Sequence, residues 1–367
     1  MSPDHLSQDK PRRRILALDG GGIRGVFTIE VLARMEGMLR QHTGKNDLVL
    51  ADHFDLISGT STGAIIATFL SWGMPVDAIR HLYSEQAQRM FTRAPWWQFH
   101  RGKFSDINIA DMLRSIFVEE DGTPALLGTS RLKTLLLIVM RNATTSSAWP
   151  LSNNPNALYN QRINADGSPS EECNLNLPLW QLVRASTAAP VYFPPEKITL
   201  GKQHFEFLDG GITAYNNPAL IAYLMATQPC YRVGWPTGVD RLHLVSIGTG
   251  QIRSRLNAFL RRILGNLSFA ATVPSGLMDS ISREQDMLCR TLGRTLHGAP
   301  IDSEATEIHG LDQFSYVRYN REFSGAEVLA AEKAHGGGFS LDNLRMIRFL
   351  TEEGQKFGEQ VQLGHIL

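Results

Sequence analysis

The chain has 367 residues, 43% of them hydrophobic, and its 36 basic side chains are balanced by 36 acidic ones. A chain of that length is long enough for one large α/β core or for two domains. A net charge of zero argues against a dedicated nucleic-acid binder, which usually carries a basic excess, so we expect no nucleic acid polymer among the partners. The longest apolar runs, such as residues 132–140, fall far short of the ~20 residues that span a bilayer, so any membrane contact is expected to be peripheral.

The N-terminal part predicts two successive strand–turn–helix units. Residues 12–22, RRRILALDGGG, predict a strand that runs into a glycine loop. The helix expected after this loop has one apolar face, which consists of Ile29, Leu32, Met35 and Leu39. Residues 53–58, HFDLIS, predict the next strand, and after a tight turn at Ser61 the apolar residues return at helical spacing.

Three further segments predict strands: residues 134–142, 204–211 and 241–250. The first and the last are continuous apolar runs, the kind that lies buried on both faces in a parallel sheet. Strands that alternate with helices predict a doubly wound α/β architecture. In such a fold, functional residues are expected in the loops at the C-terminal ends of the strands.

We divide the chain into a core, residues 14–250, and a C-terminal region, residues 251–367. The pattern of the C-terminal region is mainly helical, and we expect it to pack on the core. Two stretches of the core lack periodicity and predict irregular insertions, one near residues 87–104 and one at residues 141–174, which is rich in Asn, Ser and Pro.

The turn at Ser61 has the pattern G-x-S-x-G, with Gly59 and Gly63 on either side of the serine. In a nucleophile elbow this pattern lies between a strand and a helix and lifts the serine Oγ out of the sheet. The N–H groups and the dipole at the start of the helix then favour a developing negative charge. The pattern also occurs in plain strand–helix turns, but a predicted strand and helix flank it correctly, so we favour a nucleophilic serine.

The glycine loop at residues 18–25, LDGGGIRG, allows more than one interpretation. Its G-x-G-x-x-G spacing fits a dinucleotide-binding loop, but no acidic residue ends a second strand about 20 residues further on, and the GK[ST] ending of a P-loop is missing. An oxyanion hole suits the loop better, built from the N–H groups of Gly21 and Gly22 with Arg24 beside them. A plain strand–helix turn stays open as the simpler alternative.

The base that activates the serine is less clear from the residues alone. His243 and His297 follow the serine, as a Ser-His-Asp hydrolase of this type requires, but neither has a distinctive context. Asp209 ends a predicted strand before paired glycines, a position that an ordinary Asp-Gly-Gly turn also explains. The HGGG segment at residues 335–338 imitates a lipase motif that precedes the serine in those enzymes, and Gly336 fits a helix C-cap better.

Four blocks of the sequence, taken together, resemble the patatin-like phospholipase family. They are ILALDGGGIRG (15–25), FDLISGTSTGAI (54–65), VRASTAAPVYFPP (183–195) and FLDGGITAYNNPAL (207–220). Their order and spacing are similar to those of the family, and the resemblance covers residues 14 to about 250. It implies a three-layer α/β fold whose central sheet is mostly parallel, with helices on both faces and a helical C-terminal part.

The same resemblance implies a lipid acyl hydrolase with a Ser-Asp dyad and no catalytic histidine. Ser61 is then the nucleophile, Asp209 the base, and Gly21, Gly22 and Arg24 form the oxyanion loop. No metal site and no required cofactor are implied. The alternatives are a Ser-His-Asp esterase that uses His243 or His297 and, from another class, a catalytically silent module that binds a nucleotide at the glycine loop.

The implied substrate is a membrane phospholipid, whose acyl chain needs an apolar cleft. Aromatic residues near the first insertion either line such a cleft or pack in the ordinary way; they are Trp96, Trp97, Phe99 and Phe104. Residues 253–267 have one apolar and one basic face. This pattern is typical of a helix on an anionic bilayer and equally of a helix packed on a core, and we favour the packed helix slightly.

The chain also resembles the CapV-type phospholipases, bacterial antiphage effectors that a cyclic dinucleotide activates. This likeness implies such an activator, with arginines of the C-terminal third as candidates to meet its phosphates, although scattered arginines are usually surface charge; they are Arg253, Arg255, Arg283, Arg290 and Arg294. Three scattered cysteines and an N-terminal segment without an apolar signal region favour a cytoplasmic protein that acts at the inner face of the membrane. Assembly into a homo-oligomer is left open.

Overall fold

A computed structural model describes most of the chain: residues 7, 10–90, 104, 107–164, 166–253, 276–301, 310–336 and 342–367. The strands are β1 Arg13–Leu18, β2 Leu56–Thr60, β3 Leu135–Asn142, β4 Ser147–Ser152, β5 Glu196–Leu200, β6 Gln203–Asp209, β7 Leu242–Ile247, β8 Gln251–Arg253, β9 Arg294–His297, β10 Ser315–Tyr319 and β11 Glu322–Ser324. The α-helices are α1 Gly25–Thr43, α2 Thr62–Ser71, α3 Val76–Met90, α4 Ile107–Ile116, α5 Leu179–Ser186, α6 Ala219–Thr227, α8 Gly325–His335 and α9 Ile347–Gly358, and residues 276–292 are also helical.

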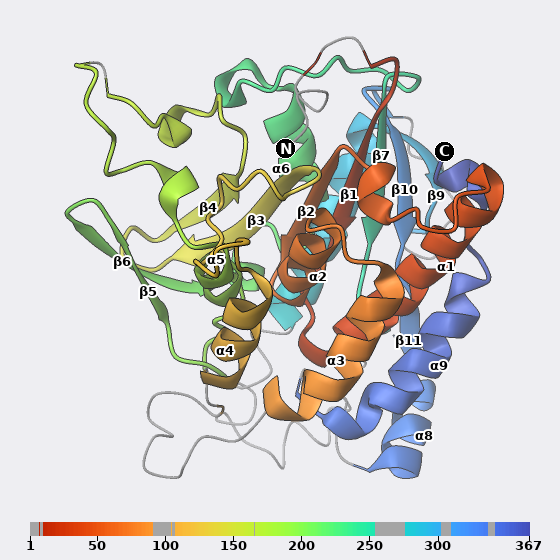
Figure 1. Ribbon diagram of the computed structural model, residues 1–367. Helices are drawn as coiled ribbons and strands as arrows, with labels where there is room; N and C mark the ends of the chain where they lie inside the picture. Colours follow the sequence, from red (N-terminus) through yellow and green to blue (C-terminus); the bar gives the residue numbers. More distant parts are fainter. Residues whose placement is uncertain are drawn as a thin grey trace.

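A mostly parallel sheet forms the centre of the molecule (Figure 1). Within the described residues its strand order is β5-β6-β3-β2-β1-β7-β10-β9, and β4 adds to β3. The six strands from β3 to β9 run parallel, whereas β4, β5 and β6 pair antiparallel with their neighbours. The predicted α/β architecture is therefore confirmed.

Helices cover both faces of this sheet, which makes three layers (Figure 1). Alternate residues of β1 belong to different cores: Leu16 and Leu18 pack with α1, α2, α5 and α9, whereas Ile15 and Ala17 pack with α6 and the 276–292 helix. This alternation follows from the period of two in a strand, and it explains why β1 is apolar at successive positions. Among the described residues, no helix has both the length and the apolar character to cross a bilayer.

The C-terminal region is helical, as expected, in α8, α9 and residues 276–292. It also supplies strands that the sequence analysis did not anticipate, because β9 and β10 extend the central sheet beyond β7. The region beyond residue 250 thus completes the sheet of the core. Gly336 ends α8 with a φ of 81°, and its N–H bonds to Glu332 O, which confirms the predicted helix C-cap.

The stretch at 141–174 is more regular than the predicted irregular insertion. It starts with the last two residues of β3 and continues into β4, which pairs with β3 from Leu137 to Asn142. Of the other predicted insertion, residues 87–90 belong to the end of α3 and Phe104 is buried. Residues 91–103 and 254–275 lie outside the described residues, and with them Trp96, Trp97, Phe99, Arg255 and most of the expected amphipathic helix at 253–267.

The pairing along β3 brings the ends of two distant strands together. Since β4 occupies one edge of β3, β2 and β6 share the other edge. The two strands approach from opposite directions: Thr60 at the end of β2 pairs with Val139, and Asp209 at the end of β6 pairs with Met140. Ser61, the residue after β2, therefore meets Asp209 across 148 positions of sequence.

Candidate active site

Ser61 lies in a sharp turn between β2 and α2 and has a positive φ of 54° with a ψ of −124°. This backbone conformation is uncommon for a residue with a Cβ and is typical of strained functional turns. The flanking glycines leave room for it, because a Cβ at Gly59 would overlap the carbonyl of Gly63, and one at Gly63 would overlap the carbonyl of Leu18. The predicted elbow glycines thus occupy positions that accept no side chain.

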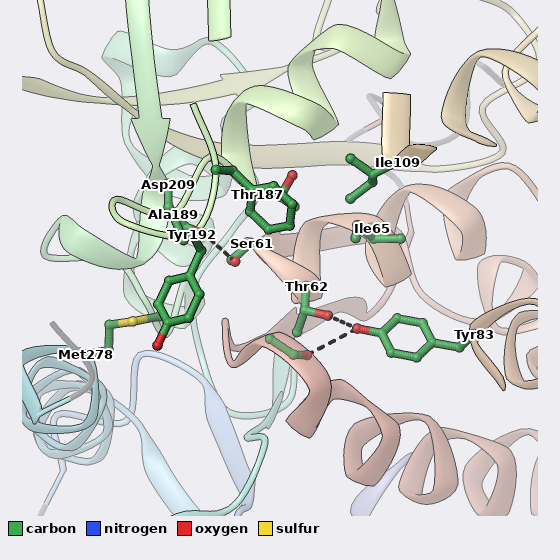
Figure 2. A pocket seen from close by; sticks show the side chains of 12 residues that line it. Ser61, Thr62, Ile65, Tyr83, Ile109, Thr187, Ala189, Tyr192, Asp209 and Met278 are labelled. Atoms are coloured by element: carbon green, nitrogen blue, oxygen red, sulfur yellow. Dashed lines mark hydrogen bonds between the residues drawn. The ribbon is translucent and has the colours of Figure 1, made fainter. Parts of the chain in front are cut away.

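The hydroxyl of Ser61 donates a hydrogen bond of 2.6 Å to Asp209 Oδ2 (Figure 2). Both side chains are buried, and only 2% of Asp209 is exposed. The other carboxylate oxygen, Oδ1, accepts a bond of 2.7 Å from Gly211 N–H. The paired glycines after Asp209 therefore fix the carboxylate in the orientation that points Oδ2 at the serine.

Burial raises the pKa of Asp209 to about 6. The hydrogen bonds from Ser61 and Gly211 and the positive charge of Arg184 act in the opposite direction and keep the pKa from rising further. Arg184 is itself fully buried on α5; its guanidinium lies over the ring of Phe193 and donates to Pro194 O. The site therefore holds a carboxylate that is a stronger base than a solvated aspartate.

The glycine loop after β1 lies beside Ser61, as predicted. Gly22 has a φ of 57° and lines the same pocket as the serine. Among the hydrogen bonds between described residues, the N–H groups of Gly21 and Gly22 donate to no acceptor. Tyr83 OH, whose pKa burial raises to about 12, donates to Gly22 O and bonds Thr62 Oγ1 (Figure 2), which ties the loop to the first turn of α2.

Arg24 supports the loop from the side away from the pocket. Its guanidinium donates to Gly250 O at 3.0 Å and to Gly21 O at 3.4 Å, and it lies 3.4 Å from Asp279 Oδ1. The side chain is buried, and it is not among the residues that line the pocket around Ser61. Arg24 therefore holds the loop in place, whereas Gly21 and Gly22 offer their backbone N–H groups as hydrogen-bond donors.

The other end of the loop is anchored by a buried ion pair that the sequence analysis missed. Arg318 on β10 donates to both carboxylate oxygens of Asp19, at 2.6 and 2.8 Å, and also to Ser246 Oγ. Burial raises the pKa of Asp19, and the charge of Arg318 opposes this rise. Because Asp19 directly precedes Gly20, this pair sets where the loop leaves the sheet.

Ser186 is a second residue without a predicted role. Its Oγ accepts a 2.9 Å hydrogen bond from Ser61 N–H and donates one of 2.6 Å to Val139 O. The bond gives a partner to a backbone group that the sharp turn would leave unpaired. Ser186 belongs to the block at residues 183–195, which is part of the family resemblance. The sequence therefore pointed to this segment but not to the contact of Ser186 with Ser61.

A small apolar pocket, with a cavity volume of about 60 Å³, opens over Ser61 (Figure 2). Its walls come from α2, α4, the segment between α5 and β5, and the 276–292 helix; they include Ile65, Ile109, Tyr192, Phe193 and Met278. Phe104, one of the aromatic residues proposed for an acyl cleft, packs behind this wall against Tyr192 and Phe193. The apolar lining therefore suits an apolar substituent of a substrate next to the serine.

Neither histidine considered as a base lies near the serine. His243 is buried on β7, where it bonds Ser315 Oγ and His365 O. On β1, Arg14 pairs with His243 and Leu18 pairs with Gly59. His243 therefore lies four residues along the strand direction from the level of Gly59, about 13 Å toward the N-terminal ends of the parallel strands. His297 is on β9, four strands from β2 in the sheet order, and stacks on His365.

No group of three or more His, Cys, Asp or Glu side chains in the described part of the chain is arranged to hold a metal ion. Of the predicted site residues, the fold brings Ser61, Asp209, Gly21 and Gly22 together, and Gly59 and Gly63 shape the turn. Arg24 lies behind the loop. The residues that sequence reasoning missed are Asp19, Thr62, Tyr83, Ser186, Met278, Asp279 and Arg318.

The chain is similar in sequence to several known proteins. Patatin-like protein 4 from Arabidopsis thaliana is 26% identical over 264 residues, which cover 65% of this chain and 60% of the relative. A cGAMP-activated phospholipase from Escherichia coli (strain TW11681) is 30% identical over 222 residues, 60% of this chain and 58% of the relative. The chain thus spans about three fifths of the length of these curated relatives.

Among solved structures, VipD from Legionella pneumophila matches 96% of this chain and 66% of its own, with a TM-score of 0.43 and 13% identity. The family model described as patatin-like phospholipase matches residues 16–223. This match covers more than half of the chain and includes the glycine loop, the serine elbow and Asp209. The chain belongs to the patatin-like phospholipase family.

Proposed function

We propose that this protein is a serine lipid acyl hydrolase, a phospholipase in which Ser61 is the nucleophile and Asp209 its general base. The observation that carries the proposal is the 2.6 Å hydrogen bond from Ser61 Oγ to Asp209 Oδ2. A carboxylate in direct contact with the hydroxyl accepts its proton without an intervening imidazole. The raised pKa of Asp209 brings its basicity closer to what a general base needs near neutral pH.

In the proposed reaction, Ser61 Oγ attacks the ester carbonyl carbon while its proton passes to Asp209. The carbonyl oxygen becomes an oxyanion, which the N–H groups of Gly21 and Gly22 and the positive end of α2 stabilise. The tetrahedral intermediate collapses with cleavage of the ester C–O bond, and Asp209 returns the proton to the leaving alcohol. Water, deprotonated by the same carboxylate, then hydrolyses the acyl-Ser61 ester and releases the fatty acid.

The substrate class follows from the pocket and the family. The apolar walls around Ser61 suit an acyl chain, and phospholipids of the inner face of the membrane are the substrates within reach of a cytoplasmic enzyme. The reaction requires no metal and no cofactor, because the base, the nucleophile and the oxyanion donors all come from this chain.

The test is release of fatty acid from phospholipid vesicles by the wild type and by two variants, Ser61→Ala and Asp209→Asn. We expect both variants to lose at least about 10³-fold in rate. Ser115→Ala, at an exposed serine of α4, is the matched control and keeps full activity.

The same assay tests the alternatives. His243→Asn and His297→Ala, checked for folding, keep most of the activity; loss of activity in either variant favours the Ser-His-Asp alternative. Equal inactivity of wild type and Ser61→Ala under every activating condition favours the silent nucleotide-binding module.

We further propose that a cyclic dinucleotide activates the enzyme, as the name of the E. coli relative states for that protein. The observation that favours this regulation is a second pocket of about 400 Å³, to which Arg283, Arg290 and Arg318 contribute. Each arginine is paired with a carboxylate, and Arg318 with Asp19 at the base of the oxyanion loop. Phosphates that draw Arg318 toward the pocket would therefore change the support of the loop.

The 276–292 helix connects the two pockets. Arg283 and Arg290 contribute to the second pocket, whereas Met278 contributes to the pocket over Ser61. A ligand shifts the population toward the active arrangement only by binding that arrangement more tightly than the resting one. We propose that the position of this helix differs between the two arrangements. Low basal activity in the absence of ligand is the corresponding expectation.

The experiment is fatty acid release with and without a panel of cyclic dinucleotides and trinucleotides. We expect at least one to raise the rate of the wild type, and Arg283→Gln to weaken this activation. Arg294→Gln is the control, because Arg294 pairs with Asp312 at the surface and lies outside the second pocket. Full activity without ligand, together with no binding of any cyclic nucleotide, contradicts this regulation and leaves a constitutive lipase.

A further inference from the structure

Three exposed apolar side chains lie within two positions of residues that line the pocket over Ser61. Ile107 at the start of α4 is 62% exposed, Val191 between α5 and β5 is 72% exposed, and Leu277 on the 276–292 helix is 48% exposed. Each lies one or two positions from a residue that lines the pocket: Ile109, Tyr192 and Met278 respectively. Because consecutive Cα atoms are about 3.8 Å apart, the three residues stand close to the pocket from three separate segments.

Val191 occupies a backbone position that disfavours valine. Tyr192 N–H bonds to Ala189 O at 3.1 Å, which closes a four-residue turn with Pro190 and Val191 in its centre. The φ of Val191 is 74°. Proline followed by a residue of positive φ is typical of a type II turn, in which the second central residue is normally Gly or Asn. A β-branched residue there is a rare exception.

The neighbours of Val191 keep this turn in one place. Phe104 N–H donates to Tyr192 O at 2.8 Å, and the rings of Phe104 and Tyr192 are stacked with centroids 6.3 Å apart. Phe193 N–H also bonds to Ala189 O. These contacts hold the turn, and the isopropyl group of Val191 is exposed on it. Since the side chain is mostly exposed, burial within this chain does not offset the unfavourable backbone.

We propose that Ile107, Val191 and Leu277 form an apolar rim that inserts into the surface of the phospholipid bilayer and holds the pocket against it. The bilayer is the expected partner because an acyl chain that moves from it to Ser61 passes from one apolar medium into the apolar pocket. An apolar rim removes the layer of water between the two. Insertion also buries the exposed side chain that the strained turn displays. This inference rests on the proposed lipid acyl hydrolase and adds how the enzyme meets its substrate.

The test separates the rim from the catalytic centre by using two substrates. Val191→Asn suits the positive φ and removes the apolar side chain, and Leu277→Asn removes a second rim residue. On vesicles of phosphatidylethanolamine and phosphatidylglycerol, we expect the double variant to lose about tenfold or more in rate. On a soluble short-chain nitrophenyl ester, we expect its rate to stay within about twofold of the wild type, because neither residue lines the pocket.

The matched control is Leu311→Asn with Leu329→Asn, two leucines that are 64% and 67% exposed and do not line the pocket. This pair should keep the wild-type rate on both substrates. Co-sedimentation with the same vesicles, in the Ser61→Ala background, measures attachment without turnover and gives an answer even if the wild type proves inactive. Equal sedimentation of the rim and control variants overturns the inference. Val191→Gly is the second variant: it should unfold at a higher temperature than the wild type and still sediment less.

Discussion

At the scale of single residues, the elbow at Ser61 depends on two glycines for a steric reason. A Cβ at Gly63 would meet the main chain of Leu18 and Asp19, which belong to the neighbouring strand and its loop and have no freedom to move aside. We predict that Gly63→Ala lowers the free energy of unfolding by about 2–4 kcal/mol, measured by urea denaturation. Gly37→Ala is the control, since nothing lies within 4 Å of its added Cβ in α1, and it should raise stability by about 0.5–1 kcal/mol. Equal effects of the two substitutions would argue against the elbow geometry.

The pH dependence of the reaction belongs to the same scale. Burial raises the pKa of Asp209 to about 6, and only the ionised carboxylate accepts the proton of Ser61. We therefore predict that kcat/KM for a soluble ester rises with pH to a plateau, with an apparent pKa of about 6, and that at pH 5 it is about tenfold below the plateau. The measurement is a pH–rate profile between pH 4.5 and 9. A midpoint near 7 that disappears in a histidine variant would instead indicate an imidazole base.

Among structural elements, the C-terminal region supports the oxyanion loop through two ion pairs. Asp279 on the 276–292 helix pairs with Arg24 at one end of the loop, and Arg318 on β10 pairs with Asp19 at the other. Both supporting residues lie outside the part of the chain that the family model matches. The catalytic core therefore needs the region beyond residue 250 for the position of its own loop.

This arrangement predicts that Asp279→Asn lowers kcat for ester hydrolysis by about three- to tenfold, while KM stays nearly unchanged. The reason is that Arg24 loses an ionic partner and the loop donors become less well aligned with the oxyanion. Asp312→Asn, which removes the surface pair with Arg294, is the control and should leave both constants unchanged. The measurement is steady-state kinetics on the soluble ester. A change in KM alone would mean that Asp279 affects binding and not the alignment of the loop.

The local parts of the site could be predicted from the sequence because each is a short pattern with its own geometry. The serine elbow, the glycine loop and the Asp209 turn each follow a predicted strand, and the parallel sheet places the first two at one edge. The ion pair of Asp19 with Arg318 spans 299 positions and the support of Ser61 by Ser186 spans 125. Contacts of this range depend on strand order, and no periodicity in the sequence gave the order β7-β10-β9 or the antiparallel approach of β6.

At the scale of the whole molecule, four histidines lie where the C-terminal segment packs against the sheet. His243 bonds His365 O, His53 bonds Ile366 O, and His297 stacks on His365. Burial lowers the pKa of His53 to about 4 and that of His243 to about 3, and it also lowers the pKa values of the other two. These groups are therefore neutral in the folded protein and bind protons more readily when it unfolds.

The sign of the effect on stability follows from that difference. Below the ordinary histidine pKa of 6.5 the unfolded chain takes up protons that the folded chain does not, so the free energy of unfolding falls as the pH drops toward 4. We predict that the urea midpoint decreases between pH 6.5 and pH 4.5, and that His243→Gln makes this decrease smaller. His42→Gln, at an exposed histidine of α1, should leave the slope unchanged. A midpoint that stays constant over this range contradicts the prediction.

Covalent labelling with a fluorophosphonate tests most directly whether Ser61 is a nucleophile activated by Asp209. Such a probe reacts with an activated serine, and mass spectrometry of the digested protein locates the adduct. We predict one adduct, on Ser61, formed at least about 10²-fold more slowly in Asp209→Asn and at an unchanged rate in His297→Ala. An adduct on another residue, or labelling of Ser61 at the same rate in Asp209→Asn as in the wild type, would contradict it.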